Sequence, residues 1–179
     1  MKKLNTYLTE KLKIGKSTKH QYAYQPTNYG ELSTILEERL TKDKDADLND
    51  IDVSKITDML DLFKDLDPHN IDVSQWDVSN VKTMNGMFFN CRNLNCNLSD
   101  WDVSNVVTMF AMFEECKMFE GKGLENWEVS GVKNMRIMFW GCVKFNCDLN
   151  DWKINQKGSD LTDTFFGCKS LKNIPKWFE

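Results

Sequence analysis

The chain has 179 residues, 41% of them hydrophobic and 28% charged, and its formal net charge is −4. No apolar run is long enough to cross a bilayer, which excludes a membrane-spanning protein. The charge balance differs from that of a protein that coats nucleic acid. The length is sufficient to bury a core without disulfides or a structural metal.

The first part of the chain, residues 1–48, is expected to form an N-terminal helical cap. Apolar residues between 4 and 12 line one face of a short helix. Asn28 and Glu31 have the spacing of a capping box, which predicts a second helix that runs to about Thr41.

The first twenty residues are basic. Glu10 is their only acidic residue. Their lysines are Lys2, Lys3, Lys11, Lys13, Lys16 and Lys19. A solvated face of the capping helix explains this charge, and contact with phosphate or with an acidic protein is the alternative. Because polar residues interrupt the apolar stretch that a secretory signal needs, we expect a cytoplasmic protein, with the cell surface as the alternative for a processed chain.

The rest of the chain repeats with a period of 25 or 26 residues. We number the repeats 1 to 5, and their first residues are Ile51, Trp76, Trp101, Trp127 and Trp152. The predicted structural ladder continues the tryptophan column to Trp177 and adds two further columns. These are the phenylalanines Phe63, Phe88, Phe113, Phe139 and Phe165 and the cysteines Cys91, Cys116, Cys142 and Cys168. A unit this short cannot bury its apolar face alone, so neighbouring repeats must stack.

This periodicity predicts a repeat solenoid, similar to a leucine-rich repeat, over residues 49–179. Leu94, Cys96 and Leu98 alternate with asparagines, which predicts a short parallel strand in each repeat. The apolar residues between Val103 and Cys116 recur every three or four positions, which predicts a short helical or 3₁₀ segment.

The repeats resemble those of a known family. The sequence WDVSNV at residues 76–81 and 101–106, with MFFNC at residues 87–91, resembles the BspA-type leucine-rich repeats of bacterial surface and lipoprotein-like proteins. The resemblance covers about residues 51–177. It implies adhesion or protein recognition without a catalytic residue. Small members without an export signal resemble proteins of gut bacteria and their phages, which implies a second setting inside a cell.

The cysteines are expected to be buried structural thiols. Leu66 occupies the cysteine column in repeat 1, and Ile71 occupies the position of Cys96 and Cys147. Leucine and isoleucine replace a buried thiol but not a metal ligand. Metal binding and disulfides are the alternatives, and we expect no metal and no cofactor.

An acidic strip follows the first residue of repeats 1 to 4, at Asp52, Asp77, Asp102 and Glu128, and Lys153 occupies this position in repeat 5. Each carboxylate is expected to accept a local backbone hydrogen bond. A strip that binds a cation or a basic partner is the alternative.

The candidate partner-binding residues follow the phenylalanine column. They are Lys64, Phe89, Glu114, Trp140 and Phe166. Aromatic residues outside a core column are typical of interaction hot spots. Half-burial against the next repeat is the alternative.

Nothing in the sequence indicates catalysis. His20 and His69 lack a cysteine or aspartate at the spacing of a nucleophile, and no phosphate-binding glycine loop occurs. We therefore predict a non-enzymatic protein–protein interaction module, intracellular and with a phage origin left open. Its partner is a protein of unknown identity, nucleic acid is not expected, and the chain is a monomer or weak oligomer. The alternatives are a surface adhesin of the BspA type and a nucleic-acid-associated protein that uses the basic head.

Overall fold

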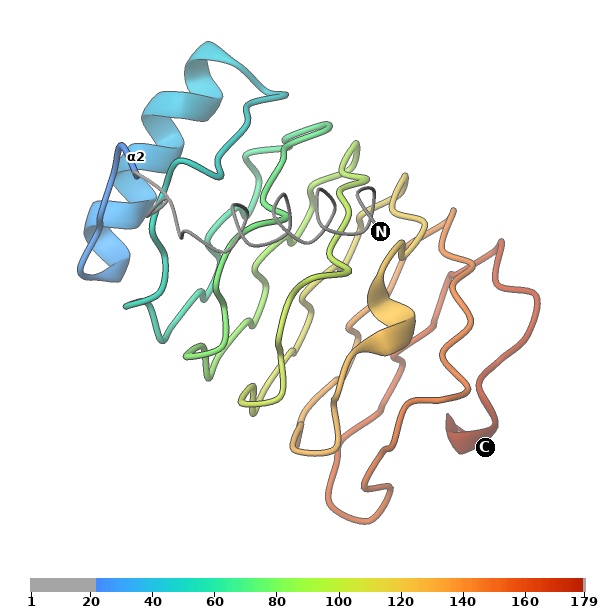
Figure 1. Cartoon of the computed structure of the whole chain (residues 1–179). Coiled ribbons are helices and arrows are strands. Elements are labelled where there is room, and N and C mark those ends of the chain that lie inside the picture. The colour runs from blue at the N-terminus through green and yellow to red at the C-terminus, as the bar shows by residue number, and fades with distance from the viewer. Residues whose placement is uncertain (1–21, 179) are drawn as a thin grey trace, which may run out of the picture.

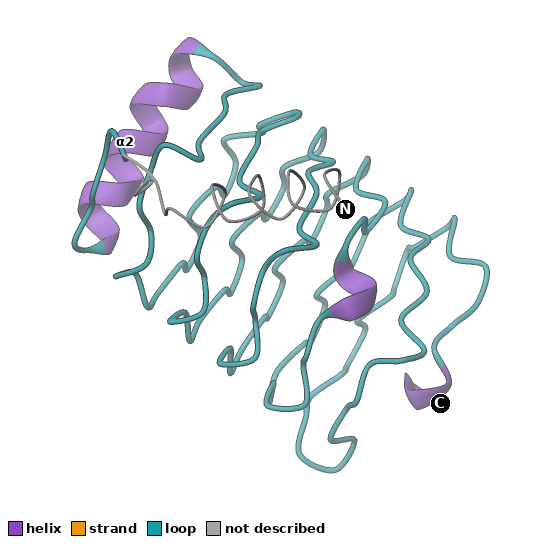
Figure 2. Ribbon diagram, in the orientation of Figure 1, coloured by secondary structure: helices purple, strands orange, loops and turns teal. Residues whose placement is uncertain are grey.

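The computed structural model describes residues 22–178 (Figures 1 and 2). The helix predicted between residues 4 and 12, the basic head and His20 lie outside this range. The described residues contain one α-helix, α2 (Tyr29–Lys42), and two 3₁₀ helices, η1 (Leu124–Asn126) and η2 (Lys176–Phe178). None of these helices is long and apolar enough to cross a membrane.

Helix α2 begins where the capping box predicts. The side chain of Asn28 accepts a hydrogen bond from the backbone N–H of Glu31 at 3.1 Å, and the Glu31 carboxylate accepts one from Thr27 N–H at 2.7 Å. Its apolar face consists of residues one turn apart that are fully buried. These residues are Leu32, Leu36 and Leu40. The predicted helix is confirmed, and it packs at one end of the repeats (Figure 1).

The repeats wind as successive turns that lie side by side (Figure 1), but the predicted leucine-rich-repeat-like solenoid of parallel strands and short helices is wrong. Residues 22–178 contain no β-sheet and only isolated parallel bridges, such as Thr83–Thr108 and Thr108–Asn134. Leu94, Cys96 and Leu98 alternate with exposed asparagines as expected, yet they form no strand.

Two left-handed positions that recur in every repeat explain why the segment predicted to be helical forms no helix. In repeat 2, Gly86 has φ = 59° and Asn90 has φ = 58°. The first of the two positions is occupied in the other repeats by Asp61, Ala111, Ile137 and Asp163, and the second by Asp65, Glu115, Gly141 and Gly167. A left-handed residue interrupts both an α-helix and a strand. The apolar spacing of three and four residues therefore reflects a chain of turns and not a helix.

Backbone hydrogen bonds join the repeats through alternate residues. The N–H groups of Met84, Gly86, Phe88 and Asn90 donate to carbonyls of repeat 3, at 2.8–3.0 Å. The residues between them close turns within their own repeat, as Phe89 N–H does on the carbonyl of Gly86. The same pattern joins repeats 1 and 2, 3 and 4, and 4 and 5. The backbone groups of this segment are thus satisfied without a sheet.

The core lies inside this stack. Trp101 is buried between Trp76 and Trp127, with ring centroids 6.4 Å apart on each side, and its indole N–H donates to the carbonyl of Val73 at 2.9 Å. The phenylalanine column stacks in parallel, with successive centroids 5.0–5.7 Å apart. Stacked aromatic side chains bury large areas and fix the register of one repeat on the next.

Hydrogen bonds also cross the predicted division between residues 48 and 49. Leu48 N–H donates to the carbonyl of Asp72 at 2.8 Å, and Asp52 N–H donates to that of Tyr24 at 2.9 Å. Residues on both sides of the division therefore take part in the contacts between successive turns.

Candidate functional site

The candidate partner-binding residues form one row on the outer edge of the repeats. The carbonyls of Phe89, Glu114, Trp140 and Phe166 each accept a hydrogen bond from the preceding repeat, at 2.7–3.0 Å. Lys64 occupies the corresponding position in repeat 1. The structure therefore brings the five residues into register beside the buried phenylalanine column.

Two side-chain contacts divide this row. The rings of Trp140 and Phe166 stack with centroids 5.7 Å apart at 13°, and Phe166 is 62% exposed. Farther along, the Lys64 ammonium lies 5.2 Å from the ring centroid of Phe89. Glu114 separates the two contacts, and partial burial together with the neighbouring Glu115 raises its pKa.

A small pocket lies beside the Trp140–Phe166 pair. Its volume is about 210 Å³, and its other lining residues include Val143, Lys117 and Lys169. The Lys117 ammonium lies 3.3 Å from a carboxylate oxygen of Glu115. Glu115 also lines the pocket, so its aromatic wall is bordered by one ion pair and by Lys169.

The acidic strip is engaged by its own backbone. Each carboxylate accepts a hydrogen bond from the N–H two residues later, at 3.0–3.1 Å. The bonds are Ser54 to Asp52, Ser79 to Asp77, Ser104 to Asp102 and Ser130 to Glu128. Side-chain and backbone hydrogen bonds from the serine lower the pKa of Asp102 and of Glu128. These contacts correspond to the local role that the sequence favours over a binding strip.

The column cysteines donate to the preceding repeat. Cys116 Sγ lies 3.0 Å from the carbonyl of Phe88, and Cys91, Cys142 and Cys168 make equivalent bonds. Burial raises the pKa of each of these thiols. All six cysteines are free. No cluster of three or more His, Cys, Asp or Glu residues in the described part is placed to hold a metal ion.

His69 has a neighbour that sequence spacing did not identify. Its Nδ1 lies 3.9 Å from a carboxylate oxygen of Asp45, and both side chains are exposed. The backbone N–H of Asn70 donates to the same Asp45 oxygen at 3.0 Å. Asp45 therefore also anchors the turn beside the histidine.

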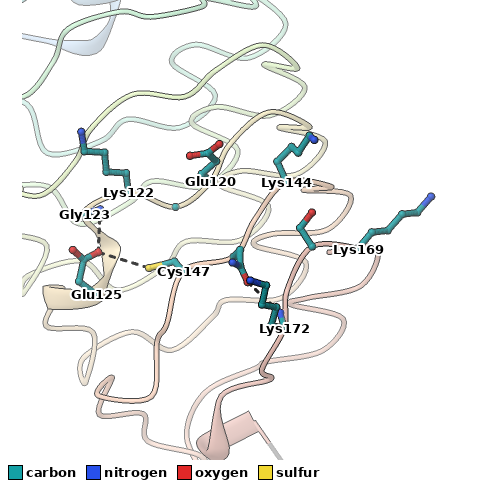
Figure 3. A pocket seen from close by; sticks show the side chains of 11 residues that line it. Glu120, Lys122, Gly123, Glu125, Lys144, Cys147, Lys169 and Lys172 are labelled. Carbon is teal, nitrogen blue, oxygen red and sulfur yellow. Dashed lines mark hydrogen bonds between the residues drawn. The ribbon is translucent and has the colours of Figure 1, made fainter.

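A larger groove over repeats 3 to 5 was missed by the sequence analysis (Figure 3). Its volume is about 830 Å³. Four exposed lysines line it, namely Lys122, Lys144, Lys169 and Lys172. Within residues 22–178, none of the four forms an ion pair. Lys169 also lines the small pocket, so the groove and the Trp140–Phe166 pair are parts of one surface.

Two glycines hold one wall of the groove close to the core. Gly121 has φ = 86° and Gly123 has φ = 92°. A Cβ atom at Gly121 would lie 2.5 Å from the Phe145 ring, and one at Gly123 would lie 2.4 Å from the backbone nitrogen of Ser99. Any larger residue would therefore push this wall outward. The spacing of 26 residues between Trp101 and Trp127, one more than between the other ladder tryptophans, is the sequence signal that could have located this wall.

Glu125 lies beside Gly123 on the same wall of the groove and is linked from there to Cys147 (Figure 3). One of its carboxylate oxygens accepts a hydrogen bond from Gly123 N–H at 3.0 Å and lies 3.7 Å from Cys147 Sγ. Burial, and then the charge of Glu125, raises the pKa of Cys147 to about 12. Cys147 is therefore a protonated thiol at neutral pH.

The family of the chain follows from its repeats. The family described as "Mycoplasma protein of unknown function, DUF285" matches residues 31–123 and 57–177. The chain belongs to this family. DUF285 is related to BspA-like repeat proteins, and at this coarser level the resemblance found in the sequence is confirmed. No curated protein and no solved structure matches the chain.

Proposed function

We propose that this chain is a non-enzymatic protein-interaction module that binds a protein partner through the outer surface of repeats 3 to 5. One observation carries the proposal, namely the stacked Trp140–Phe166 pair beside an apolar pocket, in which Phe166 is exposed and Trp140 is half-buried. Exposed aromatic pairs give large contact area at low conformational cost and are enriched at binding hot spots.

The position of the pair supports a role other than packing. The ladder tryptophans donate their indole N–H to a carbonyl of an earlier repeat, as Trp152 does to Leu124 at 2.7 Å. Trp140 makes no such hydrogen bond within the described residues, and its ring contact is with Phe166 alone. Phe166 leaves most of its surface to solvent. The pair thus lies outside the buried tryptophan ladder, and the Phe166 ring is open to a partner.

Adhesion to a cell surface is the second candidate function. The relation of DUF285 to BspA-like repeat proteins favours it, because the resemblance implies surface proteins. The same aromatic surface serves either function, and they differ in where the partner is found. We propose intracellular binding first and adhesion second.

The test compares variants of the aromatic pair with wild type. Tagged Trp140→Ser, Phe166→Ser and wild-type chains are incubated with soluble lysate of the source organism, and the retained proteins are identified by mass spectrometry. We expect a protein that wild type retains and both variants lose. With that protein purified, calorimetry should show binding weakened at least about tenfold by Phe166→Ser, since truncating a hot-spot aromatic costs about 2 kcal/mol or more.

Leu60→Ser is the matched control, because Leu60 is another exposed large apolar residue but lies in repeat 1, away from the pair. It should retain the partner at wild-type affinity, and thermal melts should show that all three variants are folded. Equal retention by wild type and both aromatic variants contradicts the proposed surface. Binding to intact cells without retention of any lysate protein favours adhesion.

A further inference from the structure

The groove has the size and the charge of a site for an acidic peptide. Its volume of about 830 Å³ lies within the range of ligand-binding clefts, on the order of 300–1,000 Å³. Its four lysines lack an ion-pair partner within residues 22–178, although the whole chain carries a net charge of −4. Because the groove is also lined by Glu120 and Glu125, its lysines outnumber its carboxylates by four to two on an otherwise acidic protein, which favours an anionic occupant.

The acidic residues of the groove favour a peptide over a nucleic acid. Glu125 is held by Gly123 N–H at 3.0 Å and leaves its charge in the groove wall, and Glu120 lies between Lys122 and Lys144 (Figure 3). These carboxylates repel a continuous phosphate backbone. A peptide instead brings N–H donors that carboxylates accept, together with separate carboxylates for the lysines.

The groove and the aromatic pair have a common border. Lys169 lines both the groove and the pocket beside Trp140 and Phe166. Val143 adds an apolar contact to that pocket. One extended segment can therefore place its acidic side chains among the lysines and an adjacent apolar side chain against the aromatic rings.

We propose, as a consequence that rests on the protein-binding function proposed above, that the groove binds a carboxylate-rich segment of the protein partner. Lys122, Lys144, Lys169 and Lys172 pair with its carboxylates, and the Trp140–Phe166 pair contacts an apolar residue next to them. The glycine-held wall formed by Gly121 and Gly123 keeps the groove open to this segment.

The probe is a short fluorescein-labelled peptide in which glutamates alternate with serines and are followed by one leucine, and binding to the full chain is measured by fluorescence anisotropy. A second peptide replaces each glutamate by glutamine. We expect the glutamate peptide to bind, the glutamine peptide to bind at least tenfold more weakly, and the affinity to fall with added salt, because exposed ion pairs are screened. Absence of glutamate-peptide binding overturns the inference, and so does equal binding of the two peptides.

Charge-neutralising variants locate the binding. Lys144→Gln with Lys172→Gln should weaken peptide binding about three- to tenfold, the loss expected for two exposed ion pairs. Lys133→Gln with Lys153→Gln is the matched control, because both lysines are exposed and neither lines the groove. An equal loss in the two double variants overturns the inference. Stronger binding of single-stranded DNA than of the glutamate peptide also overturns it, in favour of a nucleic-acid ligand.

The two proposals fail in different ways. If Phe166→Ser abolishes capture of the partner while the groove variants bind it like wild type, the acidic-segment inference is wrong and the interaction module stands. If neither set of variants changes capture of the partner, the proposed function itself is wrong, whatever the peptide does.

Discussion

The interior of the repeats and the outer surface of repeats 3 to 5 differ in how regularly their residues recur from one repeat to the next. In the interior, similar residues recur from repeat to repeat with the same contacts, as the indole N–H bonds of Trp101 and Trp127 to carbonyls of the preceding repeats show. On the outer surface, the residue beside each buried phenylalanine changes from repeat to repeat, and Gly123 lengthens one repeat. Stacking dictates the first set of residues and leaves the second free to vary.

Truncating the interior should have the largest effect. Trp101→Ala removes a buried indole that stacks on both sides, and it should lower the free energy of unfolding by about 3–5 kcal/mol. Urea unfolding followed by circular dichroism measures this loss. The outer variant Phe166→Ser serves as comparison and should change stability far less. Equal losses in the two variants contradict the division between interior and surface.

A substitution at one of the left-handed positions should have the next largest effect on stability, and it should not destabilise the fold. Ala111 has φ = 55°, where an alanine side chain is strained by about 1 kcal/mol, so Ala111→Gly should leave stability unchanged or raise it by up to about 1 kcal/mol. Ala46 is equally buried but does not have positive φ, and Ala46→Gly should cost about 0.5–1 kcal/mol. Equal losses in the two variants would mean that the turn geometry is wrong.

A smaller effect concerns the acid sensitivity of the turns. Hydrogen bonds from Ser104 lower the pKa of Asp102 in the folded protein. The ionised carboxylate therefore stabilises the fold at pH values above its pKa in the unfolded chain, which is about 4. This stabilisation is lost as the pH falls through the lower pKa of the folded protein. Asp102→Ala should therefore lower the melting temperature at pH 7 more than at pH 2. Asp151→Ala, an exposed control, should show no such difference. An Asp102→Ala deficit that is as large at pH 2 as at pH 7 contradicts the local hydrogen-bonding role.

The buried columns and the start of α2 could be predicted, although the fold class could not, because each repeat must bury equivalent side chains against its neighbours. The periods of Trp76 and Phe88 placed the buried columns, and Asn28 with Glu31 placed the start of α2. The local geometry could not be predicted from periodicity, because a chain of left-handed turns produces the same apolar spacing as a short helix. Non-glycine residues such as Ile137 at φ = 52° give no sequence signal of that conformation.

The sequence predicted only those residues of the candidate site that occupy the same position in successive repeats. Trp140 and Phe166 share a column, so the sequence placed them on one edge, although their mutual stacking needed the structure. The groove depends on side chains from three repeats that meet around an inserted residue, Gly123. Lysines such as Lys144 and Lys172 occupy different columns, and no period connects them.

The indole N–H signals of the six tryptophans test the account most directly. Five of these groups donate to backbone carbonyls, four inside the repeats and one, that of Trp76, to Leu48 just before repeat 1, and Trp140 lies outside that ladder. In a two-dimensional ¹H–¹⁵N spectrum recorded during titration with the glutamate–leucine peptide, the Trp140 signal should shift while the five ladder signals stay in place. Shifts of the ladder signals with an unchanged Trp140 would contradict recognition at the outer surface of repeats 3 to 5.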